Sequence, residues 1–455
     1  MSAPTLALAG PLADWSERDA SRLAAEAAYV LGGNDLGTMT SAAPALYPHV
    51  WSWDAAFISI GLAKISVPRA LTELQALLRA QWRTGMLPHI VFAADAPYYA
   101  PGPDWWRCAE VNPAAPRSPE TSGLIQPPVH AIAVARILAA ARRAGGADQI
   151  AMDNFLEENW SALVAWHRYL VRCRDPFGTG LLSIYHGWES GMDNSPRWDA
   201  PYSRVVPGPE LPPYRRSDTT LVTDLAQRPT DREYDRYLWL VMQLREAGYV
   251  DEIARDTVDF HAADTFMSAI FAAANDALAD VAAQTGRPEE AELREYAERF
   301  RGGVLSTVDS RGFAADRDLR AGTQLRTPSI AGFAPLISGG LPADRQATLL
   351  NLFDSPAWCG HPDLLVPAPP STSPTAPEFD SRSYWRGPQW PVLSWLFSWA
   401  LEQLGEDSRA ARLREATLTQ VSDGAFAEYY EPMTGEALGS RRQSWTAAVV
   451  LDWVL

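Results

Sequence analysis

Cysteine and histidine are scarce in this chain of 455 residues, and neither is arranged as a metal site or a disulfide framework requires. The three cysteines, Cys108, Cys173 and Cys359, have no close partner in the sequence, and the seven histidines are scattered. We expect the cysteines to be reduced thiols of the core. The sequence also lacks HExxH, GxSxG and a phosphate-binding glycine loop. We therefore predict no metal and no cofactor.

Long apolar runs and strongly basic segments are absent as well. No run of about 18 apolar residues occurs, and residues 1–12 lack the basic start of a signal peptide. We expect no membrane partner and a cytoplasmic location. The formal net charge is −16, with acidic residues spread along the chain. Such a field repels polyanions, so nucleic acid is not an expected partner, whereas homo-oligomer formation is left open.

Tryptophan, in contrast, is abundant, with 18 residues, far above the average usage of globular proteins. A flat indole matches the apolar face of a sugar ring, and its N–H can donate to a hydroxyl. A tryptophan chosen at random still belongs more often to a core. Clusters of tryptophan beside acids and glycines, however, favour a carbohydrate site.

Apolar residues at spacings of three and four predict an almost entirely helical protein. The predicted helices cover 17–31, 51–63, 67–82, 127–144, 149–172, 234–247, 263–283, 287–304, 388–404, 407–420 and 443–454, with weaker segments at 253–260 and 342–353. Asp264 and Thr265 should start one helix, and Pro388 another. Strand signals are few and short, such as those at 89–92 and 182–185. No alternation of strands and helices runs through the chain, which excludes a Rossmann or TIM architecture. About a dozen helices in antiparallel pairs can close into an all-α (α/α) barrel.

Two long connections rich in proline and glycine interrupt the helices, at 174–232 and 354–387. Loops of this length within a compact domain are usually functional. We therefore expect one catalytic domain over 1–455, in which both connections form the walls or lid of a site.

Three acidic and aromatic segments are candidates for that site. In the first, Trp51, Trp53 and Asp54 mark the start of a predicted helix, where the rings could stack on a sugar and the carboxylate could bind two hydroxyls. The alternative is an acid favoured by the helix dipole, with both tryptophans in the core.

The second segment, 187–199, holds three acids, Glu189, Asp193 and Asp199, beside Trp188 and a second tryptophan. An acid held against indole faces has a raised pKa, as a general acid near neutral pH needs. Spacing alone does not choose among the three acids. A salt-bridged surface loop around Arg197 is the alternative.

The third segment, 426–435, carries Glu428 and Glu431 among aromatic residues, and Gln443 opens the last helix. Inverting glycoside hydrolysis needs one acid for the leaving oxygen and one base for a water molecule. Two acid-aromatic loops at one end of a barrel could supply this pair. A turn with exposed glutamates is the alternative.

Aromatic and basic side chains of the long connections could complete the pocket. Tyr384, Trp385 and Trp390 are candidates, whereas Trp395 and Trp399, four residues apart, fit the core better. A substrate carboxylate could be bound by an arginine of the first connection. The arginines considered are Arg215, Arg216, Arg228 and Arg232.

Together, four blocks of sequence resemble glycoside hydrolase family 63, and within it the short bacterial glucosylglycerate and mannosylglycerate hydrolases. These blocks are W-x-W-D at 51–54, E-S-G-M-D-N-S-P-R-W-D at 189–199, S-Y-W-R-G-P at 383–388 and E-Y-Y-E-P-x-T-G at 428–435. They occur in the order of the family and span most of the chain. We expect no counterpart of the additional N-terminal β-domain of the larger eukaryotic members.

The resemblance implies an (α/α)6 barrel and an inverting mechanism, with Asp193 as general acid and Glu428 as general base. It implies that the hexose subsite is lined by Tyr47, Trp51, Asp54, Trp390 and Gln443. It implies that the glycerate faces Tyr99, His89, Gln126, Tyr384, Trp385 and one arginine, for which we select Arg228.

The expected reaction is hydrolysis of a small glycosyl-glycerate, with 2-O-α-glucosyl-D-glycerate preferred over its mannosyl analogue. Another α-glucosidase of the same kind, acting on an oligosaccharide, is the main alternative. A sugar epimerase would need facing histidines, which are not evident in the sequence, and a non-catalytic sugar-binding protein would not need acids in both loops.

Overall fold

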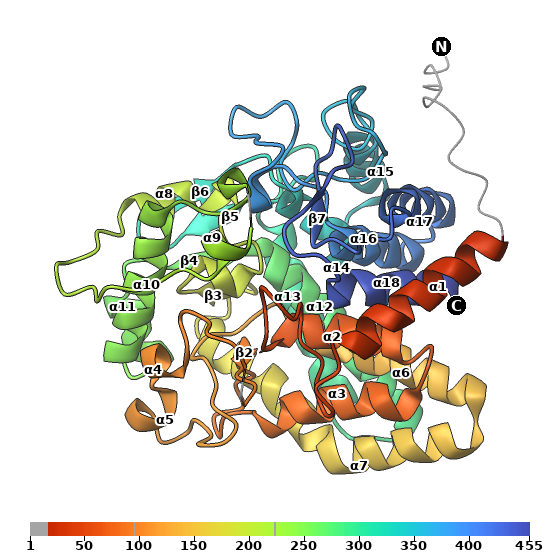
Figure 1. The fold of residues 1–455 in the computed structure, drawn as a ribbon, viewed down its shortest axis with the longest axis horizontal. Coiled ribbons are helices and arrows are strands. Elements are labelled where there is room, and N and C mark those ends of the chain that lie inside the picture. The colour runs from red at the N-terminus through yellow and green to blue at the C-terminus, as the bar shows by residue number, and fades with distance from the viewer. Residues whose placement is uncertain (1–16, 95, 223) are drawn as a thin grey trace.

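The computed structural model describes residues 17–94, 96–222 and 224–455, in which twelve barrel helices alternate between an inner and an outer ring (Figure 1). The inner helices are α2 (Ser52–Leu62), α6 (His130–Ala144), α12 (Thr265–Thr285), α14 (Ala334–Ser338), α16 (Pro391–Gln403) and α18 (Ser444–Val454). The outer helices are α1 (Glu17–Gly33), α3 (Val67–Arg79), α7 (Gly146–Tyr169), α13 (Glu290–Leu305), α15 (Ala343–Phe353) and α17 (Asp407–Val421). The segment at residues 1–12, for which no signal peptide was predicted, lies outside the described residues.

The inner ring is closed. Helix α2 contacts α6, and the contacts continue through α12, α14 and α16 to α18, which returns to α2. Every residue of α2 and of α14 is buried, because these helices are covered by neighbours and by the outer ring on all sides. The outer helix α1 packs on α18, so the first and last helices lie side by side (Figure 1). This closure confirms the predicted (α/α)6 barrel.

Helix α12 is the only helix in the described ranges that is long and apolar enough to cross a membrane by length and composition. However, 83% of its apolar window is buried inside the protein. The side chain of Asp264 caps its first turn by accepting a hydrogen bond from the N–H of Met267, as the sequence predicted. Its apolar composition therefore reflects its place in the inner ring.

Several predicted boundaries differ from the observed ones for local reasons. The helix expected from 388 begins at Pro391, because Gln389 is still extended and pairs with Tyr430. Pro391 instead takes the first-turn position. The helix expected from 234 begins at Asp231, where Thr230 and Glu233 form a capping box.

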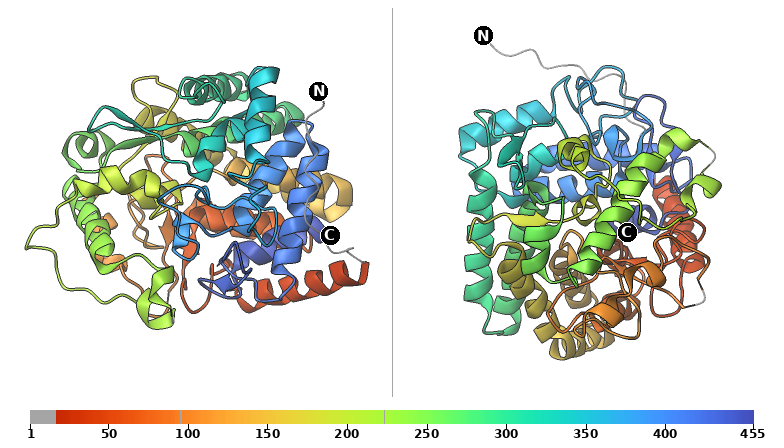
Figure 2. Two further views of the ribbon diagram at one scale, coloured as in Figure 1. Left: turned by 90° about the horizontal axis from the view of Figure 1, so that it is seen from above. Right: turned by 90° about the vertical axis from the view of Figure 1, so that its left-hand side faces the viewer.

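The connections between barrel helices contain more structure than the sequence indicated. The first includes short helices α8 (Asp199–Ser203) and α9 (Asp218–Leu221), and α10 (Asp231–Glu246) and α11 (Asp251–Thr257) follow it. An additional connection between α3 and α6, which was not predicted as an insertion, carries α4 (Pro103–Trp106) and α5 (Cys108–Val111). Figure 2 shows the α8–α10 region on the side of the barrel away from α16 to α18.

Strands in the described residues are only two or three residues long. β1 (Val50–Trp51) pairs with β2 (Ile90–Val91), and β7 (Tyr429–Tyr430) pairs with β8 (Ala437–Leu438). An antiparallel sheet is formed by β3 (Leu182–Ile184), β4 (Ala262–Asp264), β5 (Asp316–Asp318) and β6 (Thr323–Leu325). The strand signals at 89–92 and 182–185 thus correspond to β2 and β3. The remaining strands are too short to show a periodicity of two.

Candidate active site

A cavity opens where the chain enters the inner helices. Trp53 and Asp54 lie in the first turn of α2, Gln443 is the N-cap of α18, and Gln126 and Trp385 precede α6 and α16. The cavity encloses about 660 Å³ of empty space, including the part open to solvent. The N-terminal ends of the inner helices also bring their positive dipole ends to this side of the barrel.

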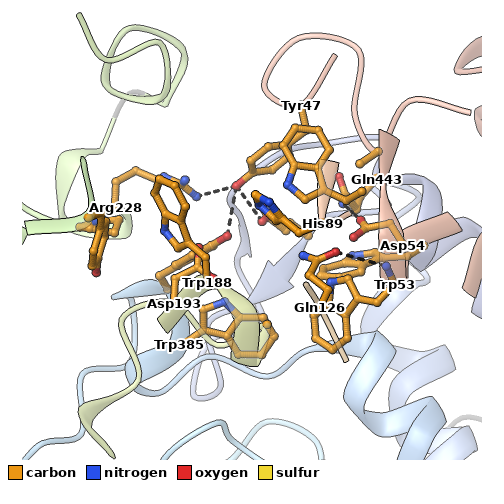
Figure 3. Close-up of a pocket in the computed structure, with 18 of the residues that line it drawn as sticks. Tyr47, Trp53, Asp54, His89, Gln126, Trp188, Asp193, Arg228, Trp385 and Gln443 are labelled. Carbon is orange, nitrogen blue, oxygen red and sulfur yellow. Dashed lines mark hydrogen bonds between the residues drawn. The ribbon is translucent and has the colours of Figure 1, made fainter. Parts of the chain in front are cut away.

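Nearly all predicted site residues line this one cavity (Figure 3). They are Tyr47, Trp51, Trp53, Asp54, His89, Tyr99, Gln126, Trp188, Asp193, Arg228, Tyr384, Trp385, Glu428 and Gln443. The segments that were singled out separately in the sequence therefore meet in space. Folding the barrel brings together acids that lie more than 200 residues apart.

Trp390 is the exception, because it does not line the cavity. Its ring stacks behind that of Trp385 at a centroid distance of 3.5 Å and an angle of 3°. It is 1% exposed and packs on its other side against Tyr429. The prediction that Trp390 contacts the sugar is therefore corrected: it supports Trp385, which lines the cavity itself. Trp395, expected in the core, is buried there.

The loop around Asp193 is held rigidly by buried ion pairs. Glu189 is fully buried and bonds Arg174 at 2.7 Å, while it also accepts hydrogen bonds from the backbone N–H groups of Tyr185 and Ile125. Farther along the loop, Arg197 is paired with carboxylates of β4 and β5. The salt-bridged alternative was thus half correct: the ion pairs exist, but they are buried and leave Asp193 facing the cavity.

Two glycines allow this loop to pack closely. Gly191 has a φ of +71°, and a Cβ at that position would lie 2.7 Å from the ring of Trp53. A Cβ on Gly187 would lie 2.1 Å from the hydroxyl of Tyr202, which donates to the backbone carbonyl of Asp193. Asp199, the third acid of the segment, pairs with Arg386 and lies outside the cavity lining. The structure therefore selects Asp193 among the three acids.

Glu428 is fixed by hydrogen bonds to both of its carboxylate oxygens. The hydroxyl of Tyr47 donates to Oε1 at 2.9 Å, and the backbone N–H of Ser440 donates to Oε2 at 3.0 Å. Gly439 permits this approach, because a Cβ there would lie 2.5 Å from Oε2. Glu431, in contrast, accepts hydrogen bonds from Met433 and Thr434 within its own turn. Glu431 therefore stabilises the turn, whereas Glu428 lines the cavity.

The pKa values of the two catalytic candidates, Asp193 and Glu428, are affected by different neighbouring groups. Burial raises the pKa of Asp193 to about 7, an effect that Arg228 opposes and Glu428 reinforces. Burial also raises the pKa of Glu428, but Arg228, the Ser440 N–H and the Tyr47 hydroxyl oppose that rise. The pKa of buried Asp54 is raised as well, chiefly by desolvation and by Glu428. Asp193 can therefore hold a proton near neutral pH while Glu428 receives stabilising hydrogen bonds.

Arg228 is the only lysine or arginine among the described residues that line the cavity. Its Nη1 donates to the Tyr47 hydroxyl at 2.8 Å, and its guanidinium lies 4.4 Å from the centre of the Tyr384 ring (Figure 3). Of the other arginines considered, Arg216 is paired with Asp218 and Asp231, and neither Arg215 nor Arg232 contributes to the lining. The choice of Arg228 agrees with this geometry.

The sequence predictions missed some of the lining. The additional residues are Ala42, Gly191, Pro229, Tyr234, Tyr237 and Trp445. Tyr234 and Tyr237 lie three residues apart on one face of α10, a spacing that could have indicated them. Trp445 lies just after Gln443 at the start of the last helix. No group of three metal-ligating side chains occurs in the described ranges, and the three cysteines are buried and unpaired.

Comparisons with known proteins identify relatives over nearly the whole chain. The model of the mannosylglycerate hydrolase MGH1-like glycoside hydrolase domain matches residues 47–446. A glucosylglycerate hydrolase of Mycolicibacterium hassiacum is 55% identical over 437 residues, which cover 95% of this chain and 98% of that protein. A mannosylglycerate hydrolase of Rubrobacter radiotolerans is 38% identical over 95% of this chain and 97% of its own.

A solved structure is similar over nearly its whole length. The crystal structure of the family 63 mannosylglycerate hydrolase from Thermus thermophilus, in complex with Tris and D-glycerate, has a TM-score of 0.86 at 36% identity. The match covers 95% of this chain and 99% of that one. The family model matches residues 47–446, and this range contains every residue that lines the cavity except Ala42. The chain therefore belongs to the mannosylglycerate hydrolase MGH1-like glycoside hydrolases.

Proposed function

We propose that this protein hydrolyses 2-O-α-glucosyl-D-glycerate to glucose and D-glycerate with inversion at the anomeric carbon. The observation that carries the proposal is the pairing of Asp193, whose pKa is about 7, with the doubly hydrogen-bonded Glu428 in one cavity beside Arg228. An acid that holds a proton and a base that is stabilised as an anion are the two groups that inversion needs.

In this mechanism Asp193 donates its proton to the glycosidic oxygen as the bond from that oxygen to C1 breaks. Glu428 removes a proton from a water molecule on the opposite face of the sugar, and the water oxygen bonds to C1. The products are β-glucose and glycerate, with Asp193 ionised and Glu428 protonated. Both groups then exchange protons with solvent. This geometry requires carboxyl groups about 6.5–9.5 Å apart, so that the water fits between them.

The cavity offers different surfaces to the two halves of the substrate. Indole rings and the Asp54 and Gln443 side chains, which lie 3.4 Å apart, suit the hydroxyls and apolar face of a hexose. Arg228, with Tyr99 and Tyr384 nearby on the lining, suits a carboxylate. We assign the hexose to the first surface and glycerate to the second.

Glucose is proposed in preference to mannose because the relative named glucosylglycerate hydrolase is 55% identical, whereas the mannosylglycerate hydrolases cited above are 36–38% identical. The two sugars differ only in the orientation of the hydroxyl at C2. Direct comparison of the two substrates therefore decides the point.

The test is the release of hexose from α-glucosylglycerate and α-mannosylglycerate, followed by proton NMR within the first minutes, before mutarotation. We expect β-glucose to appear first, and Asp193→Asn and Glu428→Gln to lose activity by several orders of magnitude. Asp199→Asn is the matched control, because this acid belongs to the same loop but pairs with Arg386 outside the cavity. Its activity should remain close to wild type.

Other outcomes would replace the proposal. First appearance of α-glucose would exclude inversion, and activity on the mannosyl compound alone would reverse the sugar assignment. Release of glucose from α-linked oligosaccharides, but not from glucosylglycerate, would establish the alternative α-glucosidase. Tight binding without turnover would indicate a binding protein. We also propose a cytoplasmic location, which three unpaired, buried cysteines support.

A further inference from the structure

A chain of hydrogen bonds runs from a buried aspartate outside the cavity to the general base. Asp218 Oδ2 accepts a hydrogen bond from Arg228 Nε at 3.1 Å, and Arg228 Nη1 donates to the Tyr47 hydroxyl at 2.8 Å. Tyr47 in turn donates to Glu428 Oε1 at 2.9 Å. Asp218 is 5% exposed and is not part of the cavity lining. It therefore reaches the base only through other residues.

The direction of this chain is fixed by chemistry. A guanidinium has donors and no acceptor, so the Tyr47 oxygen must accept from Arg228. The single proton of Tyr47 is then free to donate elsewhere, and it has two neighbours. Glu428 Oε1 lies at 2.9 Å and can only accept when ionised, whereas the Tyr384 hydroxyl lies at 3.3 Å. Donation to the carboxylate is favoured by both distance and charge.

Asp218 is well placed to hold Arg228 in this orientation. Burial alone would raise the pKa of Asp218, but Arg228 and Arg216 outweigh that effect, so its pKa lies below the ordinary value and it is ionised. Arg216 bonds both carboxylate oxygens of Asp218, at 3.0 and 2.7 Å. Arg216 also pairs with Asp231 at the start of α10. Arg216 thus holds the Asp218 carboxylate in place.

We infer that Asp218 is a positioning residue for catalysis: it aims the Arg228 guanidinium so that Tyr47 directs its proton to Glu428. The inference rests on the proposed function only in taking Glu428 as the general base. Without Asp218, Arg228 loses the partner of its Nε and turns away from Tyr47. Tyr47 can then donate to Tyr384 instead, and Glu428 loses a hydrogen bond that stabilises its ionised form.

The kinetic test compares Asp218→Ala and Asp218→Asn with wild type on α-glucosyl fluoride. This substrate has no carboxylate, so contact between Arg228 and a glycerate does not enter, and its leaving group needs little help from Asp193. The acid limb of the pH profile therefore reports Glu428. The charged or titratable groups around Glu428 in the described residues are Arg228, Asp54, Asp193, Tyr47, Tyr99, Tyr384 and Tyr429.

For Asp218→Ala we expect kcat/KM to fall about 10- to 100-fold, the size of effect that a misplaced catalytic group produces. The acid limb should move to higher pH. Asp218→Asn, which keeps an acceptor, should show a smaller change in the same direction. The control is Asp231→Asn, because Asp231 also pairs with Arg216 but is 87% exposed and does not touch Arg228. It should leave the profile in place.

The direction of the pH shift decides the inference. If Arg228 stayed in place after loss of Asp218, its unneutralised charge would move the acid limb to lower pH, and the positioning role would be overturned. An unchanged profile would overturn it as well. If the wild-type protein releases glucose from neither α-glucosylglycerate nor α-glucosyl fluoride, the proposed function itself is refuted.

A second readout does not depend on activity. Crystal structures of unliganded wild type and Asp218→Ala give the distance from Arg228 Nη1 to the Tyr47 oxygen. We expect a hydrogen bond in the wild type and its loss in the variant, with Tyr47 closer to Tyr384. An unchanged bond in the variant would contradict the inference, whatever the kinetics show.

Discussion

Replacing Asp193 with asparagine should inactivate the protein and at the same time stabilise it above pH 7. The ordinary pKa of an aspartate is 3.8, and burial raises that of Asp193 to about 7. At about 1.36 kcal/mol per pKa unit, the ionised carboxylate then costs about 4 kcal/mol in the folded state relative to the unfolded chain.

The sign follows from proton linkage. Between about pH 4 and pH 7 the folded protein retains a proton on Asp193 that the unfolded chain has already released. The free energy of unfolding therefore falls as the pH rises through this window, and the loss is complete above about pH 7. Asparagine does not titrate, so the variant escapes the loss. Its advantage should be about 1 kcal/mol at pH 4.5 and about 4 kcal/mol at pH 8.

The assay is urea unfolding followed by tryptophan fluorescence at both pH values. Asp199→Asn is again the control, because the Asp199 side chain is 53% exposed, and its effect should not grow with pH. A stability gain for Asp193→Asn that is equal at pH 4.5 and pH 8 would refute the electrostatic argument. So would a loss of stability at pH 8. The same variant links stability to function, since the destabilising carboxyl group is the proposed proton donor.

Three further substitutions test other parts of the site. Tyr47→Phe removes the hydrogen bond to Glu428, so kcat should fall about 10-fold or more and the acid limb of the pH profile should move to higher pH. An acid limb at the wild-type pH would contradict this. Gly191→Ala should lower the free energy of unfolding by about 2 kcal/mol in urea unfolding, because the new Cβ would clash with the Trp53 ring and the residue has a positive φ. Unchanged stability would show that the loop can shift to accommodate the Cβ. Glu189→Gln should cost about 3–5 kcal/mol in the same assay, since its buried arginine partner loses a counter-charge; a loss below about 1 kcal/mol would contradict the role of that pair.

Much of the fold could be predicted because it depends on patterns within single helices. Spacings of three and four located eleven of the twelve barrel helices, and local capping at Asp264 marked the start of α12. The inner helix α14 was missed, because its five residues are too few to show a helical period. Apart from β2 and β3, the short strands were not predicted, because strands of two or three residues have no detectable period. The start of α16 was misplaced for a related reason, since Gln389 stays extended to pair with Tyr430, a partner distant in sequence.

The site shows the same division. Asp193 and Glu428 were selected by resemblance to family 63, since spacing left Glu189 and Glu431 equally eligible. The structure separates them by burial and partners: Glu189 is neutralised by Arg174, and Glu431 bonds within its own turn. Which acid faces a cavity and which faces an arginine depends on residues from other elements.

The sequence by itself determined the helical class, because that class depends on local periodicity. It also determined the aromatic, acidic segments that belong to the cavity, because these are short motifs. Only the tertiary structure decided the electrostatics. It placed Trp390 behind Trp385, linked Asp218 through Arg228 and Tyr47 to Glu428, and desolvated Asp193. A pKa and a hydrogen-bond direction depend on distances between groups far apart in the chain, and those distances exist only once the barrel has closed.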